Sequence, residues 1–339
     1  MSESISQAVP GAKQSDGRQS IKRIGITLFG FAISGAALYF VFRGNFDFDK
    51  LIAGVHRIRI IPLILSVVFY WWGVIIIRAY LVRHLIRRVG DVTASTAYRY
   101  ICIGFLVNNV LPLRMGEGAR IAGIAKRSNI SMAASAGALV LERLLDLTMA
   151  AFIGIMAVQL APIPSNVRIG IIGSAAGLTV LLLALGLVAK RELKETSSLR
   201  YGRLTKFVWN MIARFSAGFR GIGSMQDLLL TVGMAVLIWA VAVGTLVLRL
   251  MAFDLPPSLP MALVLMAGIS LGISVPSAPS GIGVYHWLAA QSLILMGLND
   301  EVAFSFAFFC HFVDFAASSA WGAVCAVLEG VGWSDLKGG

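Results

Sequence analysis

The sequence is short of charge. Only 14% of its 339 residues are Asp, Glu, Lys or Arg, whereas a soluble domain carries about 25%. The hydrophobic fraction is 58% and the mean hydropathy is +0.81. This composition excludes an ordinary soluble enzyme and indicates an all-α polytopic membrane protein, because a helix needs about 20 apolar residues to cross a bilayer.

Acidic residues are scarcer than basic ones: 17 Asp and Glu stand against 29 Lys and Arg, a formal net charge of +12. The basic residues gather between apolar runs, as they do in loops on the cytoplasmic side of a membrane. We therefore expect no nucleic-acid partner. We expect a multi-pass protein of the bacterial inner (cytoplasmic) membrane with both termini in the cytoplasm.

Cysteine and soluble-type catalytic motifs are also rare or missing. Cys102, Cys310 and Cys325 are too scattered for a disulfide framework or a metal-ligand set. The sequence contains no Walker loop, dinucleotide fingerprint or Ser–His–Asp arrangement. We expect buried thiols, no metal, no cofactor, and a transporter rather than an enzyme.

The apolar runs predict six full transmembrane helices and two broken elements. The full spans are predicted at 25–42, 60–77, 133–160, 167–188, 228–250 and 302–328. The broken elements lie at 100–126 and 261–298, where Pro and Gly interrupt the apolar sequence. Irregular backbone survives at membrane depth only when it is buried in protein or lines a wet cavity. We expect both elements to be re-entrant.

One integral membrane domain is expected over 21–330, following a disordered cytoplasmic tail at 1–20. Its halves, 21–160 and 167–328, share the order span, span, broken element, span. Three crossings are an odd number, so the second half is predicted to run inverted, as in many transporters. The segment 190–220 is predicted to be a basic amphipathic connector on an anionic leaflet.

The most polar stretch within the apolar regions is NNVLPLRMGEGAR at 108–120. Arg114, Glu117 and Arg120 recur at i, i+3 and i+6, so a helix would place them near one face. We expect the guanidinium groups to bind an anion, phosphate above all, with Glu117 holding them in place. One alternative is an ion network that only fixes the loop. Another is ordinary charge at the membrane interface, which we expect of Arg120 more than of the other two residues.

Two more polar clusters accompany this stretch. Glu142, Arg143 and Asp146 share one region of the third span, either as a second layer of the site or as a structural tether to the broken element. PSAPSGIG at 276–283 offers close backbone approach and free N–H groups to an anion, or else a plain kink. The aromatic run 70–72 is expected to be a packing or interfacial anchor.

The complete set of candidate headgroup-binding residues has fifteen members. They are Asn108, Asn109, Arg114, Glu117, Arg120, Glu142, Arg143, Asp146, Ser277, Ser280, Gly281, Gly283, His286, His311 and Asp314.

Three signatures, NNxLPxRxGExxR at 108–120, ERxxD at 142–146 and PxxPxGxG at 276–283, resemble the lysylphosphatidylglycerol synthase transmembrane-region family. This family is the flippase-like half of bacterial aminoacyl-lipid synthases, and the resemblance covers roughly 20–330. It implies lipid handling, including hopanoid and polyprenyl-linked pathways. The synthase members also carry a soluble aminoacyltransferase domain, which we do not find here, so we do not expect aminoacyl transfer.

Two positions depart from the family pattern. His286 stands where the second motif continues to a Glu, and His311 stands where the last span has an Arg. We expect a His–His pair in place of a Glu–Arg pair, which opens a pH-sensitive site. His311 and Asp314 are i, i+3 on one span and serve either proton coupling and headgroup contact, or buried hydrogen bonding alone.

The leading hypothesis is a flippase that moves an anionic phospholipid or isoprenoid-type lipid through a polar midplane cavity. The alternative is an intramembrane enzyme or accessory subunit of polyprenyl-phosphate or hopanoid lipid metabolism, with Glu142 or Asp146 as a base or Mg²⁺ ligand. A third hypothesis is a scaffold that recruits partners through the basic connector. Membrane lipids are the expected partners, and a homo-oligomer or a lipid-synthesis enzyme stays open as a further partner.

Overall fold

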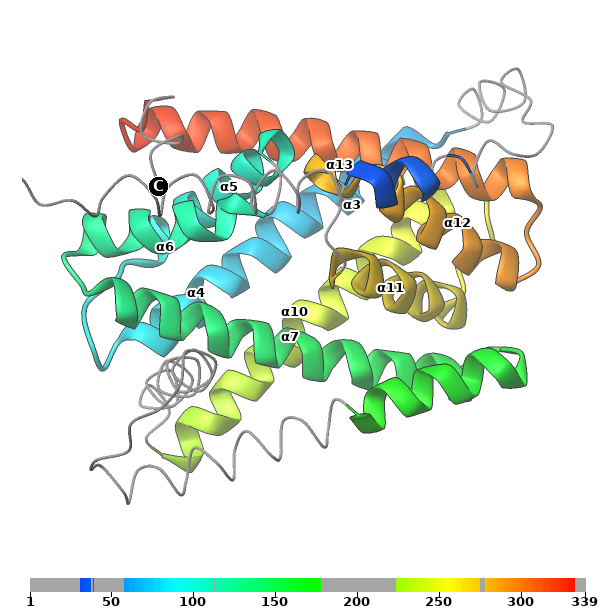
Figure 1. The fold of residues 1–339 in the computed structure, drawn as a ribbon, viewed down its shortest axis with the longest axis horizontal. Coiled ribbons are helices and arrows are strands. Elements are labelled where there is room, and N and C mark those ends of the chain that lie inside the picture. The colour runs from blue at the N-terminus through cyan, green and yellow to red at the C-terminus, as the bar shows by residue number, and fades with distance from the viewer. Residues whose placement is uncertain are drawn as a thin grey trace, which may run out of the picture.

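The computed structural model describes residues 31–37, 39, 58–111, 114–177, 224–274 and 278–332. The predicted tail at 1–20 and the connector at 190–220 lie outside these residues. Every regular element within them is a helix (Figure 1). The labelled elements are α3 (Ile60–Val68), η1 (Phe69–Val74), α4 (Ile75–Ile86), α5 (Ala94–Val110), α6 (Met115–Ser128), α7 (Met132–Leu160), α10 (Met225–Ala252), α11 (Leu259–Ser274), η2 (Pro279–Gly281), α12 (Val284–Leu295) and α13 (Asp300–Leu328). Further helical residues lie at 31–37, 39 and 165–177.

Three helices in the described part of the chain are long and apolar enough to cross a membrane. They are Ile60–Ile86, formed by α3, η1 and α4 together, Met225–Ala252 and Asp300–Leu328. α7 has 29 residues but holds Glu142, Arg143 and Asp146. The remaining predicted spans, 25–42 and 167–188, lie partly outside the described residues. The protein is therefore a helical membrane protein, and the count of six full spans stays a prediction.

Ion pairs at the helix ends fix the direction of neighbouring helices. α10 packs along α3, η1 and α4. Arg59, just before α3, bonds Asp254 after α10 at 2.6 Å, while Arg87 and Arg88 after α4 bond Asp227 at the start of α10. The two long helices are therefore antiparallel. Glu329, which follows α13, forms an ion pair of 2.8 Å with Arg99 of α5.

Each predicted broken element is a helical hairpin. In the first, α5 and α6 approach so closely that a Cβ on Gly116 would lie 1.9 Å from the carbonyl oxygen of Gly104. In the second, a Cβ on Gly268 of α11 would lie 2.2 Å from the hydroxyl of Ser292 on α12. Small residues allow helix backbones to meet in this way.

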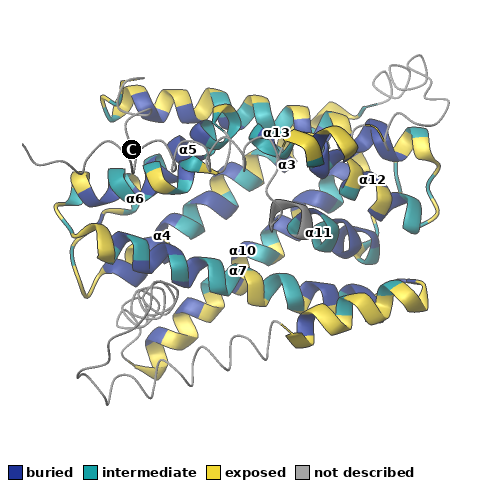
Figure 2. Cartoon of the chain, in the orientation of Figure 1, coloured by how far each residue is buried: buried dark blue, intermediate teal, exposed yellow. Residues whose placement is uncertain are grey.

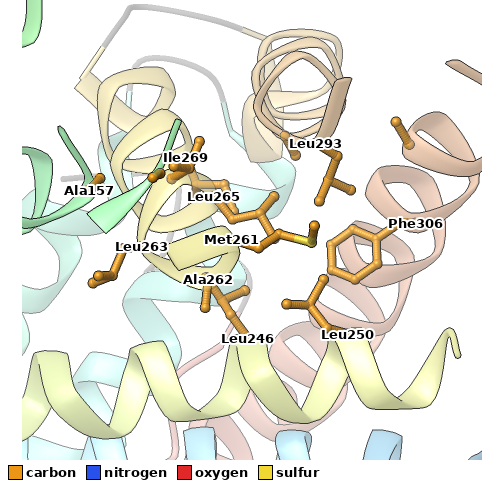
Figure 3. Close-up of a cluster of buried hydrophobic side chains, with 14 of the residues drawn as sticks. Ala157, Leu246, Leu250, Met261, Ala262, Leu263, Leu265, Ile269, Leu293 and Phe306 are labelled. Atoms are coloured by element: carbon orange, nitrogen blue, oxygen red, sulfur yellow. The ribbon is translucent and has the colours of Figure 1, made fainter. Parts of the chain in front are cut away.

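The apolar interior has two clusters, and the long helices run through both. One cluster surrounds α11 and α12, where Met261 and Leu265 point toward Leu293, Phe306 and Leu250 (Figure 3). The other surrounds α4 and α5. Many large apolar side chains on the outer faces stay exposed (Figure 2), as expected for a surface that faces lipid rather than water.

Candidate functional site

A polar cavity of about 590 Å³ lies between the two hairpins. Its walls come from α5, α6, α11, η2 and α12 of the hairpins and from η1, α4, α7, α10 and α13. Figure 1 shows α7 and α13 along opposite edges of the molecule, with α10 crossing between them. The volume falls within the range of about 300–1,000 Å³ typical of small-molecule pockets.

The first hairpin turns at Arg114. Leu111 ends α5 with extended backbone, and Arg114 precedes α6 in the left-handed region at φ 56°. The side-chain oxygen of Asn108 accepts a hydrogen bond of 2.8 Å from the backbone N–H of Gly116, the second residue of α6. Asn108 thus supplies an acceptor to one of the helix's unpaired N–H groups. A non-glycine residue at positive φ is strained, and such strain concentrates at functional sites.

Glu142 is the centre of the charged wall and has no exposed surface. It accepts two hydrogen bonds from Arg120 of α6, at 3.0 and 2.5 Å, and one of 2.7 Å from Arg78 of α4. Arg120 is itself 6% exposed. The interpretation of Arg120 as interfacial charge is therefore wrong: a second helix, α7, supplies the carboxylate that makes its burial tolerable.

Asp146 lies one helical turn beyond Glu142. It accepts a bidentate pair from Arg78, at 2.9 and 3.0 Å, and a hydrogen bond of 3.2 Å from the indole N–H of Trp239. Arg143 also approaches Asp146, at 3.1 Å. Glu117 lies 3.6 Å from Arg143, so its ion pair is with a guanidinium group of α7. Its negative charge also acts on Arg114, as the sequence spacing predicted.

These residues form one arginine cluster with four guanidinium groups and three carboxylates. Its members are Arg78, Arg114, Glu117, Arg120, Glu142, Arg143 and Asp146. One positive charge is therefore in excess. Arg114 carries it, because Arg114 lines the cavity and makes no ion pair with any other described residue.

The opposite side of the cavity has a balanced charge pair. Arg249 of α10 donates two hydrogen bonds, of 2.7 and 2.5 Å, to Asp314 of α13. Arg249 is 4% exposed, and its Nε has no hydrogen-bond partner in the described part of the chain. Asp314 thus contacts Arg249, in addition to being i, i+3 from His311.

The histidine pair, His286 of α12 and His311 of α13, lies beside this charge pair. His311 Nδ1 is 3.0 Å from His286 Nε2, and His311 Nε2 is 3.0 Å from the backbone oxygen of Ser280. The expected His–His pair is present. Tyr285 stacks on His311 with ring centroids 4.6 Å apart.

The other predicted residues have distinct places. The side-chain nitrogen of Asn109 donates to the hydroxyls of Ser318 and Ser319, at 2.6 and 2.9 Å, which ties the first hairpin to α13. Gly281 lines the cavity and Gly283, at φ 87°, precedes α12. Ser277 lies outside the described residues.

Several cavity residues escape the sequence prediction. The predicted second span ends at Ile77, which puts Arg78 in the loop that follows. In the structure the helix continues to Ile86. Tyr70 and Trp71, expected to be packing anchors, lie in η1 and line the cavity together with Trp239 and Arg249. The available signal was an arginine within a long apolar run, because such charges are costly and need partners.

The carboxylates offer no evident metal site. Both oxygens of Glu142 and both of Asp146 already accept hydrogen bonds from arginines. Within the described residues, no three His, Cys, Asp or Glu side chains gather as a ligand set. The hypothesis of Mg²⁺ held by Glu142 or Asp146 therefore gains no support from this geometry.

Comparison with known families gives a match over most of the chain. The family described as "Lysylphosphatidylglycerol synthase TM region" matches residues 27–322. No curated protein and no solved structure matches the chain.

Proposed function

The chain belongs to the lysylphosphatidylglycerol synthase TM region family, and from this membership we propose that it moves an anionic lipid between membrane leaflets. The lipid is a phospholipid or an isoprenoid-type lipid. Its headgroup occupies the cavity between the hairpins, and its tails stay in the bilayer. The membrane is the bacterial inner membrane, with both termini in the cytoplasm.

The observation that carries this proposal is the guanidinium of Arg114. It lines the cavity, belongs to an exposed residue, and makes no ion pair with a carboxylate in the described part of the chain. Ionisable residues within membrane-embedded regions usually mark a substrate path. Phosphate is a fitting counter-charge, because guanidinium binds it through two parallel hydrogen bonds.

Equivalent ion pairs in the two halves support movement between two leaflets. Asp146 and Asp314 each lie 14 residues after the first residue of their helices, α7 and α13. Each accepts a bidentate arginine from the preceding long helix, Arg78 or Arg249. Equivalent ion pairs in the two halves are what an inverted repeat would produce, and rocking of such halves exposes a central site alternately to each side.

The hairpin turns support the same repeat. Arg114 and Ser280 both precede a helix of their hairpin and both have positive φ, 56° and 59°. Arg143 and His311 are each 11 residues after the start of α7 and α13. The second half thus carries a serine and a histidine where the first half carries arginines, so anion binding is assigned to the first hairpin.

The test is mass spectrometry of lipids that co-purify with the wild type, Arg114→Ala and Arg83→Ala. Arg83 is the matched control, an exposed arginine of α4 outside the cavity. We expect one anionic lipid to be enriched, relative to the bulk membrane, with the wild type and Arg83→Ala and lost with Arg114→Ala. Vesicles with fluorescent phosphatidylglycerol then test movement between leaflets. Bulk-like lipid in all three proteins and no movement under any imposed gradient would overturn the proposal.

A further inference from the structure

The histidine pair is bonded at both ends to backbone groups of fixed polarity. The N–H of Gly283 points to His286 Nδ1 at 3.2 Å and can only donate. The carbonyl oxygen of Ser280 lies 3.0 Å from His311 Nε2 and can only accept. The hydroxyl of Ser280 lies farther from the same nitrogen, at 3.3 Å, and can also accept. His286 Nδ1 is therefore without hydrogen, and His311 Nε2 carries one.

These ends fix every proton in between. A neutral His286 without hydrogen at Nδ1 carries it at Nε2 and donates to His311 Nδ1, 3.0 Å away. His311 then has its single hydrogen at Nε2, as the carbonyl of Ser280 requires. The contacts at the two ends therefore agree with a neutral pair that carries two ring protons.

A third proton has one consequence, whichever ring receives it. If His311 Nδ1 is protonated, His286 Nε2 must accept, and the hydrogen of His286 moves to Nδ1. If His286 is protonated directly, Nδ1 is again the nitrogen that gains hydrogen. In both cases Nδ1 becomes a donor facing another donor, and the bond from the Gly283 N–H is lost.

We propose that His286 and His311 together bind one transported or coupling proton, and that binding it releases the turn between η2 and α12. This inference rests on the proposed lipid movement, because it names the ion that drives or gates it. His311 lines the cavity and gives the proton its entry. Release matters because the turn is part of the second hairpin and borders the same cavity.

The turn has few other supports. The backbone N–H of Ala278 donates to the hydroxyl of Ser34 at 2.8 Å, and a Cβ on Gly283 would lie 2.5 Å from the carbonyl oxygen of Ser34. The Gly283 end of the turn is thus held by the ring of His286, and its other end by Ser34 and by His311, which contacts Ser280. Losing the His286 ring as acceptor frees the Gly283 end while the contacts at the other end stay in place.

The groups around the pair favour a single added charge. α12 presents Tyr285, which stacks on His311, and α13 presents Asp314. Cys310 of α13 and Tyr70 of η1 lie beyond Tyr285. Arg249 of α10 already neutralises Asp314 through two hydrogen bonds. α11 carries no titratable residue. α5 has titratable residues that contact α13, but they do so near Trp321, Cys325 and Glu329. These contacts are at least ten residues from His311. One cation is therefore offset by polar neighbours, whereas two adjacent imidazolium rings would repel.

The experiment compares the wild type with the double variant His286→Asn, His311→Gln in vesicles with fluorescent phosphatidylglycerol and an interior pH dye. The Asn oxygen takes the place of Nδ1 and the Gln nitrogen that of Nε2, so both backbone contacts persist without a titratable ring. His84→Asn is the control for loss of a histidine outside the cavity. Amide hydrogen exchange of the peptide containing Gly283 is followed in the same samples.

For the wild type and His84→Asn, lipid movement should speed up at least about fivefold from pH 8 to pH 4, a window that extends below the ordinary histidine range because burial disfavours a charged ring. One net hydrogen bond changes an equilibrium constant by about that factor. Proton uptake should accompany movement, and protection of Gly283 should fall by a similar factor after correction for intrinsic exchange. The double variant should lose both pH responses.

Equal responses in wild type and double variant would overturn the proton site while leaving the proposed function intact. If no protein moves lipid, the proposed function fails, and the coupling falls with it. The exchange data then decide separately whether the proton releases the turn.

Discussion

At the scale of single residues, Glu142 holds the arginine cluster together, because it bonds arginines from two other helices and has no exposed surface. Glu142→Gln should lower the free energy of unfolding by about 3–5 kcal/mol, the usual effect of removing one partner of a buried ion pair. Thermal unfolding in detergent measures this. Glu117→Gln, whose carboxylate is 32% exposed, should cost less than about 1 kcal/mol. Equal losses would show that burial does not set the strength of these pairs.

Arg114 separates binding from stability. Arg114→Gly should abolish enrichment of anionic lipid, yet leave the free energy of unfolding within about 1 kcal/mol of the wild type, because glycine relieves the strain at positive φ. Co-purified lipid and thermal unfolding are measured on one preparation. A protein that loses lipid and unfolds much more easily would instead make Arg114 a structural residue.

The sequence located the charged motifs of the first hairpin, but it could not assign their partners. Glu117 was expected to hold Arg114 and Arg120 from its spacing, whereas its ion pair is with Arg143 of α7. Arg78 was expected in a loop, whereas two carboxylates of α7 bind it inside a helix. The local sequence shows that a charged residue lies in an apolar region and needs a partner. It does not show which helix supplies that partner.

At the scale of elements, the first hairpin depends on one glycine. Gly116→Ala should prevent the close contact of α5 with α6, since the new Cβ would lie 1.9 Å from a backbone oxygen. We expect a loss of at least about 2 kcal/mol of stability, typical of overpacking, together with loss of lipid enrichment. Gly118→Ala is the matched control in the same helix, because its Cβ would meet nothing within 4 Å. Glycine in a helix costs about 0.5–1 kcal/mol relative to alanine, so the control should be neutral or stabilising.

Helix limits were predicted best where an apolar run begins at a capping residue. The predicted spans 133–160, 228–250 and 302–328 correspond to α7, α10 and α13 within three residues. Ser131, Ser224 and Asn299 each accept a backbone N–H at the start of these helices. The span predicted to stop at 77 was nine residues too short, because arginine was taken as the end of the apolar run.

At the scale of the whole molecule, the predicted topology places Lys126 on the cytoplasmic side and Asp300 on the outer side. Lys126→Cys, on α6, should react with a membrane-impermeant maleimide only from the cytoplasmic side. Asp300→Cys, at the start of α13, should react only from outside. Both positions are exposed, and the native cysteines are buried and free, so background labelling should be low. Labelling of both sites from the same side would contradict the inverted arrangement of the halves.

The π-helical segment Phe69–Val74 is a place where the chain can change length without changing phase. A π turn accommodates an extra residue within an α-helix, so deleting one residue there would restore regular α geometry and leave Arg78 facing Glu142 and Asp146. The same deletion in the regular helix just before Arg78 would instead rotate everything that follows by about 100°. Either protein would keep its hydropathy and every recognisable motif. Only in the second would Arg78 turn away, so that two carboxylates lose a shared cation through a change of phase alone.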